Sequence, residues 1–305
     1  MLYKLLKIFI RLALRIFCKS IHIKNKHLLL YKGPLLVTAN HPNSFLDAII
    51  IGSVFKHPVH FLARGDAFNK PWHRKLLGLL QMVPIYRLSE GRENLYLNND
   101  AFTTSKNILA NNGIVLIFIE GICRHTHQLQ PFKKGAARIA FSCWKDHINV
   151  QVMPLAIQYN SLKKFGKRVT LTALPLLSIT QLYQPDESEA RNNLYFNRII
   201  FKQLDDALAI EPFVEKRKAP AIMRLPAMLG KLLHAPLYYP VKHWVARKTA
   251  GTVYYDAVLF GMLLCLYPVY LMLMLLVVAL LHVCLYIQLL LVMVHILCAY
   301  CTALV

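Results

Sequence analysis

The sequence predicts an α/β fold in which a largely parallel sheet is flanked by helices, with an N-terminal amphipathic helix and a C-terminal apolar membrane segment of one or two helices. Three observations lead to this prediction. Short apolar runs alternate with helical patterns between residues 31 and 160, cations recur every three or four residues at the N-terminus, and residues 257–305 are nearly all apolar.

The central alternation predicts the sheet. Apolar, β-rich runs at 35–39, 59–62, 82–86, 114–119 and 150–159 are predicted strands, and helical patterns occupy 44–54, 94–110 and 136–144. The run at 114–119 is continuously apolar, which is typical of a strand buried on both faces of a parallel sheet. Because strands alternate with helices, we expect crossover connections and a largely parallel sheet. The polar stretch 178–189 is a predicted loop.

The N-terminal segment is a predicted interfacial helix. Its cations lie three or four residues apart and form one stripe on a helix, with Leu, Ile and Phe covering much of the rest: Lys4, Lys7, Arg11 and Arg15. We expect the cations to face lipid phosphates and the apolar side chains to enter the acyl region. An amphipathic helix packed against a soluble core is the alternative. A signal peptide is disfavoured because the cations interrupt the apolar run.

The C-terminal tail is long enough for two membrane spans of about 20 residues each. Pro268 would kink the first span, and a tight turn near His282 would join it to the second. A single long tilted helix and a re-entrant hairpin are the alternatives. Three cations precede the tail and none follows: Lys242, Arg247 and Lys248. By the positive-inside rule, we expect a membrane location with the main domain facing the cytoplasm.

Length, charge and cysteine content narrow the organisation. The 305 residues are expected to divide into an interfacial helix (1–24), a main domain (25–215), a basic connection (216–256) and membrane helices (257–305). A chain with 56% hydrophobic residues and a net charge of +21 fits an anionic membrane surface better than nucleic acid, for which no recognised motif is present. Seven scattered cysteines indicate no disulfide framework, and no Cys or His spacing indicates a metal site.

A histidine and an aspartate follow the first predicted strand and are candidates for an acid–base pair. The segment reads Asn40-His41-Pro42-Asn43-Ser44-Phe45-Leu46-Asp47. Open α/β sheets present functional side chains at the carboxyl ends of their strands. A carboxylate bound to one ring nitrogen fixes the histidine tautomer, so that the pair can activate an alcohol. The alternative is a helix cap at Asn43 or Ser44 beside an ordinary loop histidine.

Three more blocks stand at predicted strand ends. They read Phe118-Ile119-Glu120-Gly121-Ile122-Cys123-Arg124, Val83-Pro84-Ile85-Tyr86-Arg87 and Met153-Pro154-Leu155-Ala156-Ile157. In the first, a glutamate adjoins a tight glycine turn, and Arg124, Lys133 and Lys134 are cations suited to a phosphate. The second places Arg87 directly after a strand, and the third would shape an apolar groove. A solvated basic loop is the alternative for the cations.

In this order and at this spacing, the four blocks resemble the glycerolipid acyltransferase family, which includes bacterial 1-acylglycerol-3-phosphate acyltransferases. The family has an Asn-His start with a downstream Asp, a strand ending in Arg, a Phe-x-Glu-Gly block with Arg and a Pro-containing strand. Two departures mark a divergent subfamily. Five residues rather than four separate His41 from Asp47, and Arg124 stands one position later than the family's arginine. We expect a turn at Pro42 and Asn43 to return Asp47 to His41.

The resemblance implies transfer of a fatty acyl group from acyl-CoA or acyl-carrier protein onto the hydroxyl of 1-acylglycerol-3-phosphate, in phospholipid biosynthesis, with no cofactor or metal. His41 would be the base and Asp47 would orient it. The residues expected to bind substrate are Asn40, Arg87, Glu120, Gly121, Arg124 and Lys133. Backbone N–H groups near Gly121 would contribute to an oxyanion site. Cys123 is not needed as a nucleophile, because direct transfer from a thioester is feasible.

Other functions remain open from the sequence. The acceptor is alternatively glycerol-3-phosphate, a lysophospholipid with a larger headgroup or an amino-acid lipid. A non-catalytic lipid-binding membrane protein is a different class, and the intact His41, Asp47 and Glu120 argue against it. The expected partners are membrane lipids and the acyl donor, and nucleic acid is not among them.

Overall fold

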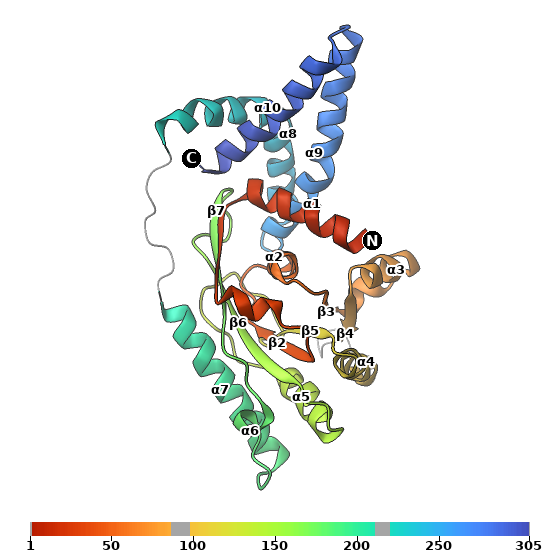
Figure 1. Ribbon diagram of the computed structural model, residues 1–305, viewed down its shortest axis with the longest axis vertical. Coiled ribbons are helices and arrows are strands. Elements are labelled where there is room, and N and C mark those ends of the chain that lie inside the picture. Colours follow the sequence, from red (N-terminus) through yellow and green to blue (C-terminus); the bar gives the residue numbers. More distant parts are fainter. Residues whose placement is uncertain (1, 87–97, 211–219, 305) are drawn as a thin grey trace.

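The computed structural model describes residues 2–86, 98–210 and 220–304. Helices cover both faces of a central sheet, and a group of long helices stands at one end of the molecule, above α1 and α2 in the view of Figure 1. This arrangement confirms the predicted α/β fold with a mostly parallel sheet.

Seven strands form one sheet in the order β1-β7-β6-β2-β5-β3-β4. Their bounds are β1 Cys18–Lys24, β2 Leu35–Ala39, β3 Val59–Arg64, β4 Met82–Ile85, β5 Ile114–Phe118, β6 Gln151–Tyr159 and β7 Lys167–Ala173. All neighbouring strands are parallel except β6 and β7, which are antiparallel. The central strand β2 is buried along its whole length, as expected for a parallel strand covered on both faces.

The helices fall into two sets. Those around the sheet are α1 Leu2–Phe17, α2 Phe45–Val54, α3 Pro71–Leu79, α4 Asn98–Ala110, α5 Gly135–Lys145, α6 Ile179–Leu182 and α7 Glu189–Ala209. The C-terminal set is α8 Arg224–Lys248, α9 Tyr255–Leu280 and α10 Leu285–Leu304. Short 3-10 turns occupy Lys26–Leu30, Gly65–Phe68 and Ala221–Met223.

Two apolar cores lie on opposite faces of the sheet. On one face, residues of α1, α2, α8 and the start of α9 pack on the sheet, with Val37, Leu46 and Phe260 among the buried members. On the other face, α4, α5 and α7 supply the cover, with Leu36 and Phe196 buried between them. Alternate residues of β2 thus enter different cores, as the period of a strand requires.

One expected boundary is wrong, and two other segments contain helices that were not predicted. The helix predicted for 1–24 ends at Phe17, and Cys18–Lys24 forms the edge strand β1, paired in parallel with β7. The connection predicted for 216–256 contains the long helix α8, which includes Pro236 and Pro240. Within the predicted loop 178–189, Ile179–Leu182 forms the short helix α6.

The orientation predicted for the N-terminal helix is also wrong for two cations. The Lys7 ammonium donates to the carbonyl of Phe55, and the Arg11 guanidinium donates to that of Ser53, so both bind the carboxyl end of α2. Cations at this end of a helix satisfy free carbonyls and complement the helix dipole. Burial, with a smaller repulsion from Arg11, lowers the pKa of Lys7 to about 8. Four apolar residues of α1 are also exposed: Leu5, Ile8, Phe9 and Leu12.

The tail forms two helices, as the first of the sequence alternatives predicted. Both α9 and α10 are long and apolar enough to cross a membrane. They are joined by a tight turn at His282, whose φ of 55° is in the left-handed region. Helix α10 returns along α8, where Gly230 allows close approach: a Cβ there would stand 2.3 Å from the Cys298 carbonyl oxygen.

Candidate active site

The candidate site lies where the neighbouring strands β2 and β5 end, beside β6. Ala39 at the end of β2 is in register with Phe118 of β5 and Leu155 of β6. The chain leaves β2 at Asn40 and enters α2 at Phe45, and it leaves β5 toward Glu120. The two chemistry-bearing blocks therefore meet at the carboxyl edge of the sheet, where open α/β folds place their sites.

The structure brings His41 and Asp47 into direct contact. The Nδ1 atom of His41 is 2.9 Å from Oδ2 of Asp47, despite the five intervening residues. The imidazole stacks on the Phe118 ring, with centroids 3.7 Å apart and planes 11° from parallel. Its side chain is 13% exposed. With Nδ1 donating to the carboxylate, Nε2 is the atom that can accept a proton from a ligand at the surface.

Asp47 is fully buried and is held by several donors. Besides His41, its carboxylate accepts from the backbone N–H of Asn43 at 2.8 Å and from the Tyr159 hydroxyl at 2.7 Å. It also stands in the first turn of α2, where the helix dipole favours a negative charge. Burial, followed by the Asp47 charge, raises the pKa of Tyr159 well above its usual value, so this residue remains a neutral donor. These contacts compensate for the burial of the carboxylate.

Asn40 joins the end of β2 to β6. Its side-chain amide donates to the carbonyl of Ile157 at 3.0 Å and accepts from the Ile157 N–H at 2.8 Å. These two bonds extend the strand pairing by one residue and fix the backbone that leads into His41. The predicted contact of Asn40 with substrate stays a prediction.

Glu120 faces the histidine from the end of β5. Its Oε1 atom accepts from the His41 backbone N–H at 3.2 Å, and it also accepts from the backbone of Gln130. Burial raises the pKa of this carboxyl to about 7, with a smaller contribution from the Asp47 charge and an opposing one from the two hydrogen bonds. Glu120 thus braces the two loops of the site against each other.

The glycine turn and the cations follow Glu120. Gly121 has a φ of +68°, and its N–H donates to the carbonyl of Phe118. The expected oxyanion donors near Gly121 stay a prediction. The Lys133 side chain crosses this glycine, since a Cβ on Gly121 would lie 2.8 Å from the Lys133 Cγ. Arg124 and Lys133 are both exposed at the surface. Arg87 lies outside the described residues.

The two departures from the family pattern contact each other. The backbone N–H of Ser44, in the longer loop between His41 and Asp47, donates to the Sγ atom of Cys123 at 3.0 Å. Cys123 is one of the two residues between Gly121 and Arg124. Ser44 has a φ of 52°, a strained conformation for a residue with a side chain. The extra length of one loop is therefore held by the extra length of the other.

Sequence reasoning missed two contributors. Tyr159 is the last residue of a predicted strand, and only the register of β6 shows that its hydroxyl reaches Asp47. Phe118 is the first residue of the Phe118–Arg124 block, but its stacking on His41 was not expected. An aromatic residue immediately before the Ile-Glu-Gly segment was the available signal.

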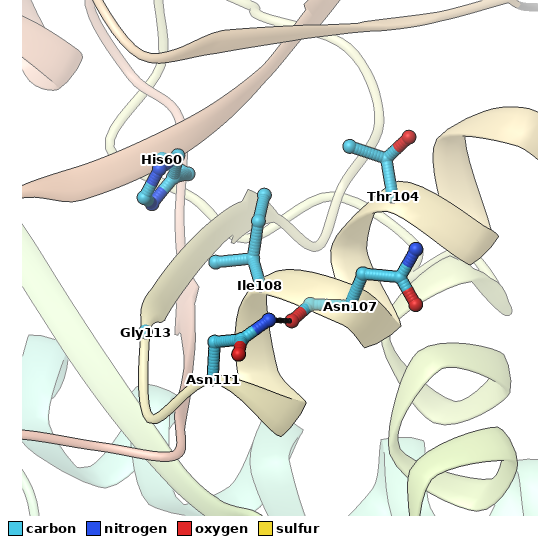
Figure 2. Close-up of a pocket in the computed structure, with 6 residues that line it drawn as sticks. All are labelled: His60, Thr104, Asn107, Ile108, Asn111 and Gly113. Atoms are coloured by element: carbon cyan, nitrogen blue, oxygen red, sulfur yellow. Dashed lines mark hydrogen bonds between the residues drawn. The ribbon is translucent and has the colours of Figure 1, made fainter.

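A separate hollow of about 350 Å³ lies at the opposite edge of the sheet. Figure 2 shows the residues that line it. It is lined by His60, Thr104, Asn107, Ile108, Asn111 and Gly113. His60 and Gly113 lie at the amino ends of β3 and β5, whereas His41 follows the carboxyl end of β2. The hollow is therefore not part of the histidine site. Among the described residues, no group of three or more His, Cys, Asp or Glu side chains is arranged to hold a metal ion.

A buried carboxylate that orients a partly exposed histidine at strand ends defines an acid–base enzyme site. Residues 20–158 match the family model described as Acyltransferase. This match confirms the family that the four blocks predicted for this segment, and residues 20–158 form an acyltransferase domain.

Among solved structures, the chain is similar to the crystal structure of the 1-acyl-sn-glycerophosphate (LPA) acyltransferase PlsC from Thermotoga maritima. The two are 18% identical with a TM-score of 0.47, and the alignment covers 68% of this chain and 80% of that one. No protein with a curated function matches the chain.

Proposed function

We propose that this acyltransferase is membrane-bound and moves a fatty acyl group from acyl-CoA or acyl-carrier protein onto the hydroxyl of 1-acylglycerol-3-phosphate. The observation that carries the proposal is the 2.9 Å contact between His41 and the buried Asp47. Such a pair supplies a base whose tautomer is already set, which acyl transfer from a thioester to an alcohol needs.

The chemistry follows from the geometry of the pair. His41 Nε2 removes the proton of the acceptor hydroxyl while the oxygen attacks the thioester carbonyl carbon. The new C–O bond forms, the C–S bond breaks, and the imidazolium gives its proton to the leaving thiolate, so that a free thiol and neutral His41 result. Asp47 stabilises that imidazolium without itself taking the proton. The stacked Phe118 ring keeps the imidazole plane fixed through both proton transfers.

The acceptor phosphate is assigned to the cations beside the site. Arg124 follows Glu120 in the same loop, and Lys133 crosses Gly121, so both are near the strand ends that carry His41. A guanidinium binds a phosphate through two parallel hydrogen bonds, and an ammonium adds charge. In this proposal Glu120 positions the loops and Arg87 adds a third cation.

The membrane location rests on two surfaces. The exposed apolar residues of α1 and the apolar helices α9 and α10 would enter the bilayer. The cations that precede α9 favour a cytoplasmic position for the catalytic domain. An acyltransferase held in this way meets acceptors and products that are dissolved in the membrane.

Purified full-length protein in lipid vesicles tests the proposal. Labelled acyl-CoA and acyl-carrier protein are offered against 1-acylglycerol-3-phosphate, glycerol-3-phosphate, larger lysophospholipids and an amino-acid lysolipid. His41→Ala should lower turnover by about 10²–10⁴-fold, the usual contribution of a general base. His60→Ala is the matched control, because His60 is a partly buried histidine at the opposite edge of the sheet.

The outcomes separate the alternatives. Transfer to 1-acylglycerol-3-phosphate that is lost in His41→Ala and kept in His60→Ala supports the proposal. Preference for a different acceptor would retain the chemistry and change the substrate. Undiminished turnover in folded His41→Ala, or no transfer from either donor to any acceptor, would overturn it.

A further inference from the structure

The loop between His41 and Asp47 is held from both sides by one residue, Asn43. Its backbone N–H donates to Asp47 Oδ2 at 2.8 Å. Its side-chain amide donates to Oδ2 of Asp256 at 2.8 Å. Asn43 is completely buried. It connects the carboxylate of the proposed catalytic pair to that of Asp256, which stands 213 residues after Asn43.

Asp256 is an unusual residue in its segment. It is the only charged residue after Lys248, and it stands in the first turn of the apolar helix α9. It is buried and forms an ion pair with the buried Lys167 of β7. Burial lowers the pKa of Lys167 to about 7, against smaller opposing contributions from Cys18 and from the Asp47 charge. Removing one of two buried charges that lie in contact would leave the other uncompensated, which is costly.

The start of α9 also contacts the start of α2. The ring of Tyr254, the residue before α9, stacks with that of Phe45, the first residue of α2, with centroids 5.9 Å apart. Ser44, whose backbone is strained, immediately precedes Phe45 in the chain. A loop in such a conformation keeps it only where its surroundings hold it in place.

We propose that Asp256 is a positioning residue for the His41–Asp47 pair, which it holds in place through Asn43. The inference rests on the proposed function, because the pair must carry the reaction for its position to affect turnover. Asp256 does not touch the reacting atoms. It fixes the loop, the loop fixes Asp47, and Asp47 orients the imidazole.

One consequence concerns the membrane helices. Since Asp256 belongs to α9, the geometry of the active site depends on how this helix is seated against the domain. The lone charge at the head of an otherwise uncharged tail therefore connects the bilayer-facing hairpin to the catalytic loop. Lys167, from strand β7, lies against that charge.

A matched pair of double variants isolates the hydrogen bond from the buried charges. The amide variant, Lys167→Met with Asp256→Asn, removes both charges and keeps an oxygen that accepts from Asn43. The leucine variant, Lys167→Met with Asp256→Leu, removes the charges and the acceptor at nearly the same volume.

Two single variants complete the set. Asn43→Ala is a milder change than either double variant, since it leaves the ion pair of Lys167 and Asp256 intact. Asn192→Ala is the control, because it removes a buried asparagine of α7 that binds the backbone of Gln184, away from the site.

All variants are compared as full chains in lipid vesicles. The amide variant should keep kcat within about threefold, whereas the leucine variant and Asn43→Ala should each lose about 10- to 100-fold in kcat with KM within about twofold. Adding Asn43→Ala to the leucine variant should cause little further loss, because the two changes break the same connection. Asn192→Ala should leave kcat unchanged even if it lowers the unfolding temperature.

A spectroscopic measurement tests the same inference without turnover. In ¹⁵N-labelled protein, the Nδ1 proton of His41, assigned by its loss in His41→Gln, should be observed in the wild type and the amide variant. It should broaden or vanish in the leucine variant and in Asn43→Ala. A signal that persists in the folded leucine variant or in folded Asn43→Ala would overturn the inference.

The two proposals fail in different ways. If the wild type transfers acyl groups, and the leucine variant and Asn43→Ala keep wild-type kcat or lose activity only through KM, the positioning role is wrong and the function stands. If the wild type transfers nothing, the proposed function is wrong, and the His41 signal still decides whether Asp256 positions the pair. If the leucine variant does not fold, Asn43→Ala decides by the same two measurements.

Discussion

The sheet and the α9–α10 hairpin differ in where their apolar side chains lie. Every residue of β2 is buried inside the protein, and two cores cover the two faces of the sheet. In α9, by contrast, Leu273, Leu276 and Leu280 are more than half exposed. The sheet therefore obtains its stability from its own packing, whereas the hairpin has an apolar surface that suits a bilayer. The two regions meet at the first turn of α9, beside the active-site loop.

The largest expected difference is between two leucine truncations. Leu116→Ala in β5 removes a fully buried side chain and should lower the free energy of unfolding by about 2–5 kcal/mol. Leu276→Ala in α9 removes a side chain that touches little protein and should change it by less than about 0.5 kcal/mol. Urea unfolding of the domain in detergent micelles, followed by near-UV circular dichroism, measures both. Equal losses would show that the hairpin is part of the same cooperative core.

The sequence predicted the central strands well because their signal is local. Residues 35–39 form β2 with the predicted bounds, and the turn near His282 joins two helices as one of the alternatives required. Strand β2 is buried on both faces, and the two helices joined at His282 are apolar along most of their length. There the apolar pattern alone identifies the element.

The missed features depend on residues far apart in the chain. Strand β1 exists because Ile21 pairs in register with Val169, and nothing within 18–24 reveals that partner. The residue pattern of α1 predicted a polar and an apolar face. It did not reveal that Arg11 on the polar face would bind the end of α2. In the site, the His41–Asp47 contact was expected, while the reach of Asp256 to Asn43 required the seating of α9.

A pH measurement distinguishes the active-site edge from the hairpin. Glu120 has a pKa raised to about 7 by burial, above its unfolded value, so its contribution to stability is complete below about pH 4.5 and is lost as the pH rises through 7. The wild type should therefore lose on the order of 1–2 kcal/mol between pH 5 and 8 relative to Glu120→Gln, which stays neutral. Urea unfolding at a series of pH values measures the difference.

The control for this measurement is Glu189→Gln, which neutralises an exposed glutamate on α7. It should leave the pH dependence of unfolding as it is in the wild type. Parallel curves for Glu120→Gln and the wild type would show that Glu120 does not titrate in this range.

Helix α1 shares properties of both regions, and a smaller effect tests to which it belongs. Arg11→Ala removes the hydrogen bond to Ser53 at the end of α2 and should cost about 1 kcal/mol, the usual net value of such a bond. Arg15→Ala, one turn further along, removes the same type of side chain at an exposed position where the described residues provide no such contact. Urea unfolding compares the two variants. Equal, negligible losses would indicate that α1 is held by the bilayer rather than by α2.

The smallest effect is expected at an exposed ion pair of the domain. Lys106 Nζ lies 2.6 Å from Asp146 Oδ2, and hydrogen bonding to Lys106 lowers the pKa of the Asp146 carboxyl. A depressed carboxyl pKa gives stability that is present above the unfolded value and lost as the pH falls through the folded one. Because both groups are in solvent, salt and water screen the pair, and Asp146→Ala should leave the midpoint of unfolding unchanged within error.

Repeating this last measurement at low and at high salt makes the result decisive. A destabilisation that appears at low salt and disappears at high salt would still identify a screened surface pair. A loss of stability that persists at high salt would contradict the expectation. Asp146 would then behave like the buried Asp256, whose ion pair solvent does not screen. In that case, location at the surface would not separate weak ion pairs from strong ones in this protein. The contrast between domain and hairpin would then depend on apolar packing alone.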